Sequence, residues 1–253
     1  MGFWHPHTST IDWCEINYAV TQYIVEFYNS LSSLLSFFLA LFLAFQSHHL
    51  LPLSFIFGYF WIGLVALGSF LFHSTLKFHM QLLDEIPMLY GISHSIYNLL
   101  PLKHKYWGGA ALVLLNGAFT MYYLESRNPL IHEAFFFLLI VALVGFLLLK
   151  MKECRTRGQL AKAKKSLHLF VIGIELIIVG FVLWIMDNVC CKRLSDWKLG
   201  LGFSGPLLEL HCWWHVLSYS GFLWLQTSIS LIQFHNREPQ VKYFLNLWPY
   251  LQI

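Results

Sequence analysis

Residues 211–232 read HCWWHVLSYSGFLWLQTSISLI and form the last long apolar run of the chain. The run opens with His211 and His215, which lie four residues apart. On a helix, residues at that spacing share one face, so both imidazoles can reach the same ion. A run of about 20 apolar residues is also long enough to cross a lipid bilayer as a helix. This stretch therefore predicts a membrane-spanning helix that carries part of a metal site.

The composition of the whole chain is typical of a membrane protein. Of its 253 residues, 57% are hydrophobic and only 11% are charged, whereas soluble domains carry about 25% charged residues. The 23 Phe, 12 Tyr and 10 Trp suit lipid-facing and interfacial surfaces. A net charge of +3 is too small to indicate nucleic-acid binding. We expect an integral membrane protein with no nucleic-acid partner, and no obligate protein partner is evident.

Seven apolar segments are long enough to cross a bilayer, so the sequence predicts an all-α, seven-transmembrane helix bundle. They lie at roughly 27–46, 54–73, 84–101, 107–124, 130–149, 167–186 and 211–232. The chain 1–253 is then a single domain with an N-terminal segment 1–26, a bundle 27–232 and a tail 233–253. The third segment opens with Asp84 and Glu85, so it spans only if its polar face lies inside the bundle. In the first segment, Ser32 and Ser33 indicate close helix packing.

Lys and Arg are distributed unequally between the two sides of this predicted bundle. Eleven lie in the odd-numbered loops and the tail, and five lie on the other side, with none before Lys77. Cytosolic loops carry the excess of basic residues in membrane proteins. We therefore expect the N-terminal segment outside the cell or in a lumen, and the C-terminus in the cytosol.

This orientation brings a second group of polar residues to the histidine pair. His73 ends the second predicted helix and Asp84 begins the third, on the side where His211 and His215 begin the seventh. Ser69 lies one helical turn before His73. Three neutral nitrogens beside a carboxylate and a hydroxyl match a catalytic zinc site with an open position. The sequence therefore predicts a zinc site at the non-cytosolic end of the bundle.

An acidic cluster precedes the first predicted helix and has no Lys or Arg near it in the sequence. It consists of Asp12, Glu15, Asn17 and Glu26. Oxygen ligands of this kind suit a hard ion such as calcium. Acidic clusters are also common on solvated surfaces, so both interpretations stay open on spacing alone.

Three of the five cysteines lie on the non-cytosolic side, where disulfides persist. Either Cys190 or Cys191 can therefore pair with Cys14 and tie the N-terminal segment to the sixth loop. We expect Cys154 to be free, and Cys212 to pack within the bundle.

Five segments spread along the chain resemble the alkaline ceramidases, in particular the alkaline ceramidase 3 subgroup. They read STIDWCEINY, VEFYNSLS, GSFLFHSTLKFHMQLLDEIPM, WIMDN and HCWWHVL, in the same order as in that family. The likeness runs from about residue 9 to the motif VKYFLNLWP and is weaker in the fourth and fifth helices. The family belongs to a superfamily of seven-helix membrane hydrolases that includes the adiponectin-type receptors.

The resemblance implies a role for each residue already singled out. It places Ser69 and Asp84 beside a zinc ion held by His73, His211 and His215. It makes Cys191 the disulfide partner of Cys14. It assigns calcium to the side chains of Asp12, Glu15, Asn17 and Glu26 and to the carbonyl of Trp13.

The implied activity is zinc-dependent hydrolysis of the ceramide amide bond to sphingosine, or a related sphingoid base, and a free fatty acid. We expect Asp84 to act as general base and Ser69 to donate to the oxyanion, and calcium to be structural or regulatory. Ceramide and membrane lipids would be the partners, in the endoplasmic reticulum and/or the Golgi membrane. The alternatives are an adiponectin-type receptor, a hydrolase of another lipid amide, and a transporter lined by Asp84, Glu85, His94 and Glu175.

Overall fold

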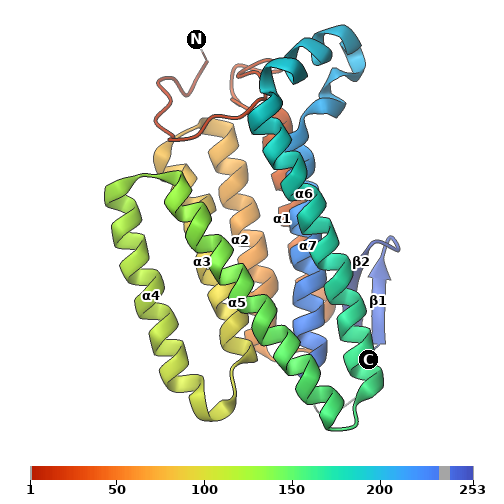
Figure 1. Cartoon of the computed structure of the whole chain (residues 1–253). Coiled ribbons are helices and arrows are strands. Elements are labelled where there is room, and N and C mark those ends of the chain that lie inside the picture. Colours follow the sequence, from red (N-terminus) through yellow and green to blue (C-terminus); the bar gives the residue numbers. More distant parts are fainter. Residues whose placement is uncertain (1, 234–239, 253) are drawn as a thin grey trace.

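The computed structural model describes residues 2–233 and 240–252, and helices dominate it (Figure 1). The α-helices of this part of the chain are α1 (Phe27–Ser47), α2 (Leu53–Thr75), α3 (Phe78–Leu99), α4 (Lys105–Ser126), α5 (Pro129–Thr156), α6 (Leu160–Leu201) and α7 (Leu210–Gln233). A 3-10 turn η1 (Leu102–His104) lies between α3 and α4, and a second, η2 (Gly202–Leu208), lies between α6 and α7. Strands β1 (Gln240–Phe244) and β2 (Trp248–Gln252) follow α7. Each predicted apolar segment overlaps one α-helix.

Four of the described segments are both long enough and apolar enough to cross a membrane. They are Phe27–Ser47, Leu53–Thr75, Pro129–Thr156 and Leu160–Gln233, the last of which contains α6, η2 and α7. Helices α3 and α4 have 22 residues each, but polar residues lower their hydropathy. The membrane character of the chain is thus carried by these four segments, and the count of seven spans stays a prediction.

Helix α3 begins before the predicted segment 84–101. Leu76 has a left-handed φ of 46° and ends α2, and Lys77 is already the N-cap of α3. The chain therefore reverses within two residues, and Asp84 lies in the second turn of α3 instead of at its start. The helix ends at Leu99 because Pro101 disfavours a helical conformation in Leu100, which is extended.

Helix α6 is much longer than the predicted segment 167–186. Its 42 residues correspond to about 63 Å of helix, roughly twice the thickness of a bilayer core, and the last turns bend away from the axis of the earlier ones (Figure 1). No proline lies between residues 187 and 201 to break the helix. The additional turns extend beyond the bundle at the end where the N-terminal segment lies (Figure 1), and they carry Cys190 and Cys191.

The described part of the predicted tail 233–253 is packed against the bundle as an antiparallel hairpin of β1 and β2. The indole N–H of Trp248 donates to Ser220 Oγ at 2.9 Å, and Thr227 Oγ1 donates to the Pro249 carbonyl at 2.9 Å. Residues 234–239 and 253 lie outside the described part of the chain. The predicted all-α class is confirmed for the bundle, but it did not include this hairpin.

Helix α7 lies at the centre of the bundle and contacts α1, α2, α3, α5 and α6. It approaches α6 closely at Gly221, where an added Cβ would meet the Gly173 carbonyl oxygen at 2.6 Å. Helix α4 lies outside, against α3 (Figure 1). This arrangement places the first turns of α7 beside the last turns of α2, at the end of the bundle that the N-terminal segment covers.

Candidate functional site

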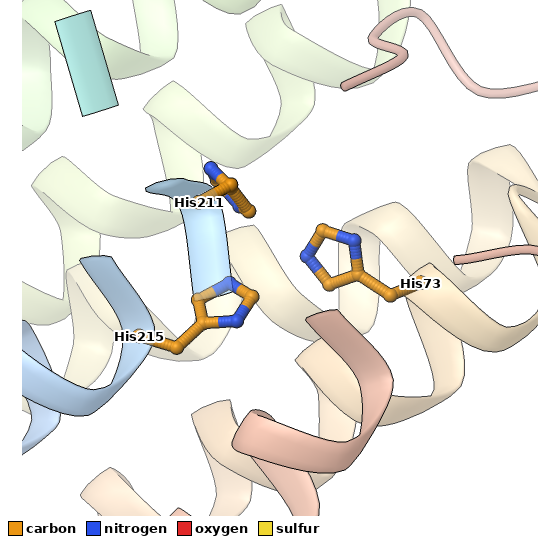
Figure 2. Close-up of side chains that lie close together, drawn as sticks. All are labelled: His73, His211 and His215. Atoms are coloured by element: carbon orange, nitrogen blue, oxygen red, sulfur yellow. The ribbon is translucent and has the colours of Figure 1, made fainter. Parts of the chain in front are cut away.

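The three histidines predicted from the sequence lie together between α2 and α7 (Figure 2). Each of His73, His211 and His215 offers one ring nitrogen, and these three atoms all lie within 4.8 Å of one another. All three side chains are buried, with exposed fractions of 1%, 3% and 4%. In the described part of the chain, no other His, Cys, Asp or Glu residues form a group of three or more at this spacing.

Hydrogen bonds of two of the histidines leave their Nε2 atoms free for a metal. His73 Nδ1 lies 2.5 Å from Glu26 Oε2, and a carboxylate accepts the proton of that nitrogen. His215 Nδ1 lies 3.0 Å from Ser32 Oγ and 3.1 Å from Ser33 Oγ. Both serines give their single proton elsewhere, to Asn29 O or another hydroxyl, so they accept from His215. Such partners fix the tautomer of metal-binding histidines.

The third histidine contains a polar atom without a partner. His211 Nδ1 is buried and has no hydrogen-bond partner in the described part of the chain. Buried polar atoms are nearly always paired, so this one indicates a missing ligand. The Trp13 ring stacks on His211 with centroids 3.7 Å apart. The donor set and this orphan atom fit a metal ion bound by three neutral imidazoles.

Ser69 and Asp84 lie beside the histidines, as the sequence predicted. The close approach of α3 to α2 at Gly68, where a Cβ would overlap the Leu83 backbone, brings them together. Ser69 Oγ lies 3.0 Å from Ser33 Oγ, within hydrogen-bond distance, and is a polar neighbour of the Asp84 carboxyl. Both residues line the same cavity as the histidines. A carboxylate and a hydroxyl are thus available where a substrate would contact a metal.

The cavity next to this site is large and mostly apolar. It has a volume of about 510 Å³ and is lined by side chains of α2, α3, α5, α6 and α7. Along α7 it extends from His211 to Ile229, which corresponds to roughly 27 Å at the helical rise. Phe137 of α5 and Ile178 of α6 line it and are also exposed on the outer surface. Its shape and walls suit long alkyl chains that enter from the surrounding lipid.

The acidic cluster is arranged more loosely than the histidines. Trp13 N donates to Asp12 Oδ1 at 3.1 Å and to Glu26 Oε1 at 3.2 Å, and Asn17 Nδ2 lies 3.4 Å from Asp12. Asn17 Oδ1 is buried and has no partner in the described residues. Glu15 instead accepts the first backbone N–H groups of α1, from Tyr28 and Asn29. Hydrogen bonds thus link Asp12 to Asn17 and, through the Trp13 N–H, to Glu26, while Glu15 caps α1 beside them.

Burial shapes the charge of these carboxyl groups. It raises the pKa of Glu15 to about 8, against the opposing effect of the two backbone hydrogen bonds. It also raises the pKa of Glu26, which is fully buried. Carboxyl groups in such surroundings favour the protonated form unless a cation compensates their charge. If these carboxyl groups are ionised, their charge needs compensation by a cation.

The N-terminal segment is tied to α6 by a disulfide between Cys14 and Cys191, the pair that the resemblance implied. Asp187 Oδ2 accepts from Cys14 N at 3.2 Å. Lys198 Nζ donates to Cys14 O at 3.2 Å and to Glu209 Oε2 at 2.6 Å. The sequence did not predict that Asp187, Lys198 and Glu209 support the site. Only Asp187 had a signal, since it lies in the motif WIMDN.

Other polar residues of the membrane segments do not join this site. Among the described residues that line the cavity, Asp84 and Glu85 are present, but His94 and Glu175 are not. Glu175 is exposed on α6, and His94 contacts Ser54 at 3.3 Å. A transporter pathway lined by all four residues is therefore not supported by this arrangement.

Comparisons with known proteins agree over nearly the full length. A family model described as Ceramidase matches residues 5–252. Alkaline ceramidase 3 of Mus musculus is 32% identical over 259 residues, which cover 98% of this chain and 93% of that protein. Alkaline ceramidase of Arabidopsis thaliana is 30% identical, with 100% and 95% covered, and alkaline ceramidase YPC1 of Saccharomyces cerevisiae is 29% identical, with 99% and 92% covered. The resemblance is confirmed, and the chain belongs to the ceramidase family.

Proposed function

We propose that this protein hydrolyses the amide bond of ceramide and releases a sphingoid base and a free fatty acid. The observation that carries the proposal is the buried histidine group, which opens on a long apolar cavity beside Ser69 and Asp84. The similarity to proteins named alkaline ceramidases supports the same reaction.

We propose zinc as the metal, held by His73, His211 and His215. Three neutral nitrogens are a common ligand set for catalytic zinc, and they leave one position open. A zinc ion there would polarise the amide carbonyl and promote the deprotonation of water near neutral pH. Glu26 and the pair Ser32 and Ser33 hold the rings of His73 and His215 in the orientation that such binding requires.

Asp84 is the residue best placed to move protons. In the proposed reaction it accepts a proton from the attacking water and then delivers it to the departing nitrogen of the sphingoid base. Ser69, a polar neighbour of Asp84, would orient this carboxylate and donate a hydrogen bond to the tetrahedral oxyanion.

The substrate class follows from the cavity. Ceramide carries two long alkyl chains, and the apolar walls between α5 and α6 suit them better than an aqueous funnel would. Another lipid amide has the same reacting group, so the assay includes an N-acylethanolamine beside a panel of ceramides. Release of sphingoid base from ceramide by purified protein supports the proposal. Binding without turnover of any amide would instead favour an adiponectin-type receptor.

For the membrane arrangement, we propose seven spans in a single domain, with the N-terminal segment in the lumen and the C-terminus in the cytosol, in the endoplasmic reticulum or Golgi membrane. The chain has no Asn-x-Ser/Thr acceptor of its own. We expect Pro6→Asn, which creates an acceptor with Thr8, to be glycosylated in cells. The same acceptor tripeptide inserted after Gly158 should remain unmodified. Glycans at Gly158 and none at Pro6 would reverse the proposed orientation.

We also propose that calcium binds Asp12, Glu15, Asn17, Glu26 and the Trp13 carbonyl. The orphan Asn17 Oδ1 and the buried carboxyl groups support this assignment. The ion would fasten the N-terminal segment to α1 and, through Glu26, to His73. Its role would be structural or regulatory, since the reacting amide lies in the cavity on the other side of His73.

We expect calcium to raise the melting temperature of the wild type by several degrees, because a ligand that binds only the folded state stabilises it. Asp12→Asn should abolish this shift and retain zinc, since Asp12 bonds Trp13 and Asn17 and no histidine. Glu26→Gln should abolish the shift and also weaken zinc binding. Asp196→Asn, at an exposed acidic residue on the same side, is the control. A full calcium shift in Asp12→Asn would refute the site.

A further inference from the structure

Tyr219 lies at the proposed reaction site but belongs to none of the groups described so far. It is on α7, one helical turn after His215, and the two ring centroids are 6.0 Å apart. The side chain is 7% exposed and lines the cavity together with Ser69 and Asp84. A tyrosine hydroxyl in an apolar cavity needs a hydrogen-bond partner.

The polar groups next to this hydroxyl are those of Ser69 and Asp84, which line the same cavity. Ser69 forms a hydrogen bond with Ser33 Oγ at 3.0 Å, and Asp84 and Tyr219 are its other polar neighbours. A serine hydroxyl has one proton and two lone pairs. The one proton of Ser33 can go to Asn29 O or to Ser69 Oγ, so Ser33 does not decide the role of Ser69. An ionised Asp84 can only accept, so it takes the Ser69 proton. Any hydrogen bond between Tyr219 and Ser69 is then donated by Tyr219, which leaves the tyrosine as a donor at the edge of the site.

This arrangement limits what Ser69 can do at the start of the reaction. While Asp84 is ionised, the single proton of Ser69 is engaged with the carboxylate and cannot serve the amide carbonyl. The proton of Tyr219 is held only by a neutral hydroxyl, which is a weaker acceptor than an oxyanion. In a water-poor cavity the preference for the charged acceptor is larger than in water.

We propose that Tyr219 is a further catalytic residue for ceramide hydrolysis, an inference that rests on the function proposed above. Its hydroxyl turns from Ser69 Oγ to the amide carbonyl oxygen of the substrate as negative charge develops there. No proton is transferred: one hydrogen bond is exchanged for another. When Asp84 has taken the proton of the attacking water, it no longer accepts a hydrogen bond from Ser69. The Ser69 hydroxyl can then donate to the oxyanion as a second donor.

The first test is Tyr219→Phe, which removes the hydroxyl and keeps the ring. Loss of one oxyanion donor typically lowers turnover by about 10²-fold, so we expect a fall of that order in kcat, with KM and bound zinc unchanged. Tyr59→Phe is the matched control. Tyr59 is fully buried and bonds a hydroxyl, Thr227 Oγ1 at 2.9 Å, but it does not line the cavity. The Tyr59→Phe variant should lose as much thermal stability as Tyr219→Phe and keep the kcat of the wild type.

The second test separates direct contact with the substrate from an effect through Ser69. Tyr219→Phe is introduced into Ser69→Ala, and kcat, zinc content and melting temperature are measured for both single variants and the double variant. A further fall in kcat in the double variant is expected. No further fall would mean that Tyr219 only positions Ser69, and an unchanged kcat in Tyr219→Phe alone would overturn the proposal as well. A wild type that hydrolyses no ceramide would overturn the proposed function and this inference together.

Discussion

Replacement of His215 with Ala will remove zinc and ceramide turnover together. His215 supplies one of the three clustered nitrogens, and the two that remain cannot complete the ligand set of a catalytic zinc site. The purified variant should contain far less than one zinc per chain, as counted by elemental analysis, and should release no detectable sphingoid base. The zinc content and the rate of release are to be measured on the same sample.

His94→Ala is the control for this prediction. His94 is a partly buried histidine that contacts Ser54 and does not line the cavity. It should keep both zinc and turnover, which would show that loss of a membrane histidine is not damaging in itself. A His215→Ala protein that turns over ceramide at the wild-type rate would contradict the assignment of the metal ligands.

Replacement of Asp84 with Asn will leave zinc bound and lower kcat by about 10²- to 10⁴-fold, the usual contribution of a general acid–base group. Asn keeps the shape of the side chain and a hydrogen-bonding oxygen for Ser69, but it cannot take a proton from water. The substrate is held mainly by the apolar cavity, so KM should change little. Steady-state kinetics with one ceramide, together with zinc analysis, provide the measurement.

Glu85→Gln is the matched control for Asp84. Glu85 is the adjacent carboxyl on α3 and also lines the cavity, but both of its oxygens are occupied. Gln81 Nε2 donates to Oε1 at 3.0 Å, and Tyr123 OH donates to Oε2 at 2.5 Å. We expect a small effect on kcat. A large loss in Glu85→Gln with wild-type kcat in Asp84→Asn would move the role of general base to Glu85.

The sequence predicted the existence of the helices better than their ends. Apolar runs of about 20 residues reveal helices because the bilayer sets their length. The ends depend on local geometry that hydropathy does not report, such as the left-handed Leu76 before α3. Helix α6 continues past residue 186 because nothing there breaks it, even though its polar residues no longer suit a membrane. The tail hairpin has no apolar run long enough to be noticed.

The sequence predicted which residues meet at the candidate site, but it did not predict the hydrogen bonds that hold them in place. The four-residue spacing places His211 and His215 on one helix face, and the predicted orientation brings His73 to the same side of the membrane. Both inferences depend only on helix geometry and topology. The bond from Glu26 to His73 and the serine bonds of His215 depend on how α1 is rotated. The sequence predicts only a packing role for Ser32 and Ser33, but both also form hydrogen bonds with His215. Tyr219 was not singled out, because an aromatic residue in an apolar run carries no pattern of its own.

In the proposed function, bound zinc and ceramide hydrolysis belong to the same site. The most direct test removes the metal from the purified wild type with a chelator and then restores zinc in steps. The release of sphingoid base is followed at each step. We predict that activity disappears with the metal and returns in proportion to zinc, and that it is complete near one ion per chain. Full turnover of ceramide by the metal-free protein would show that the hydrolysis does not depend on zinc.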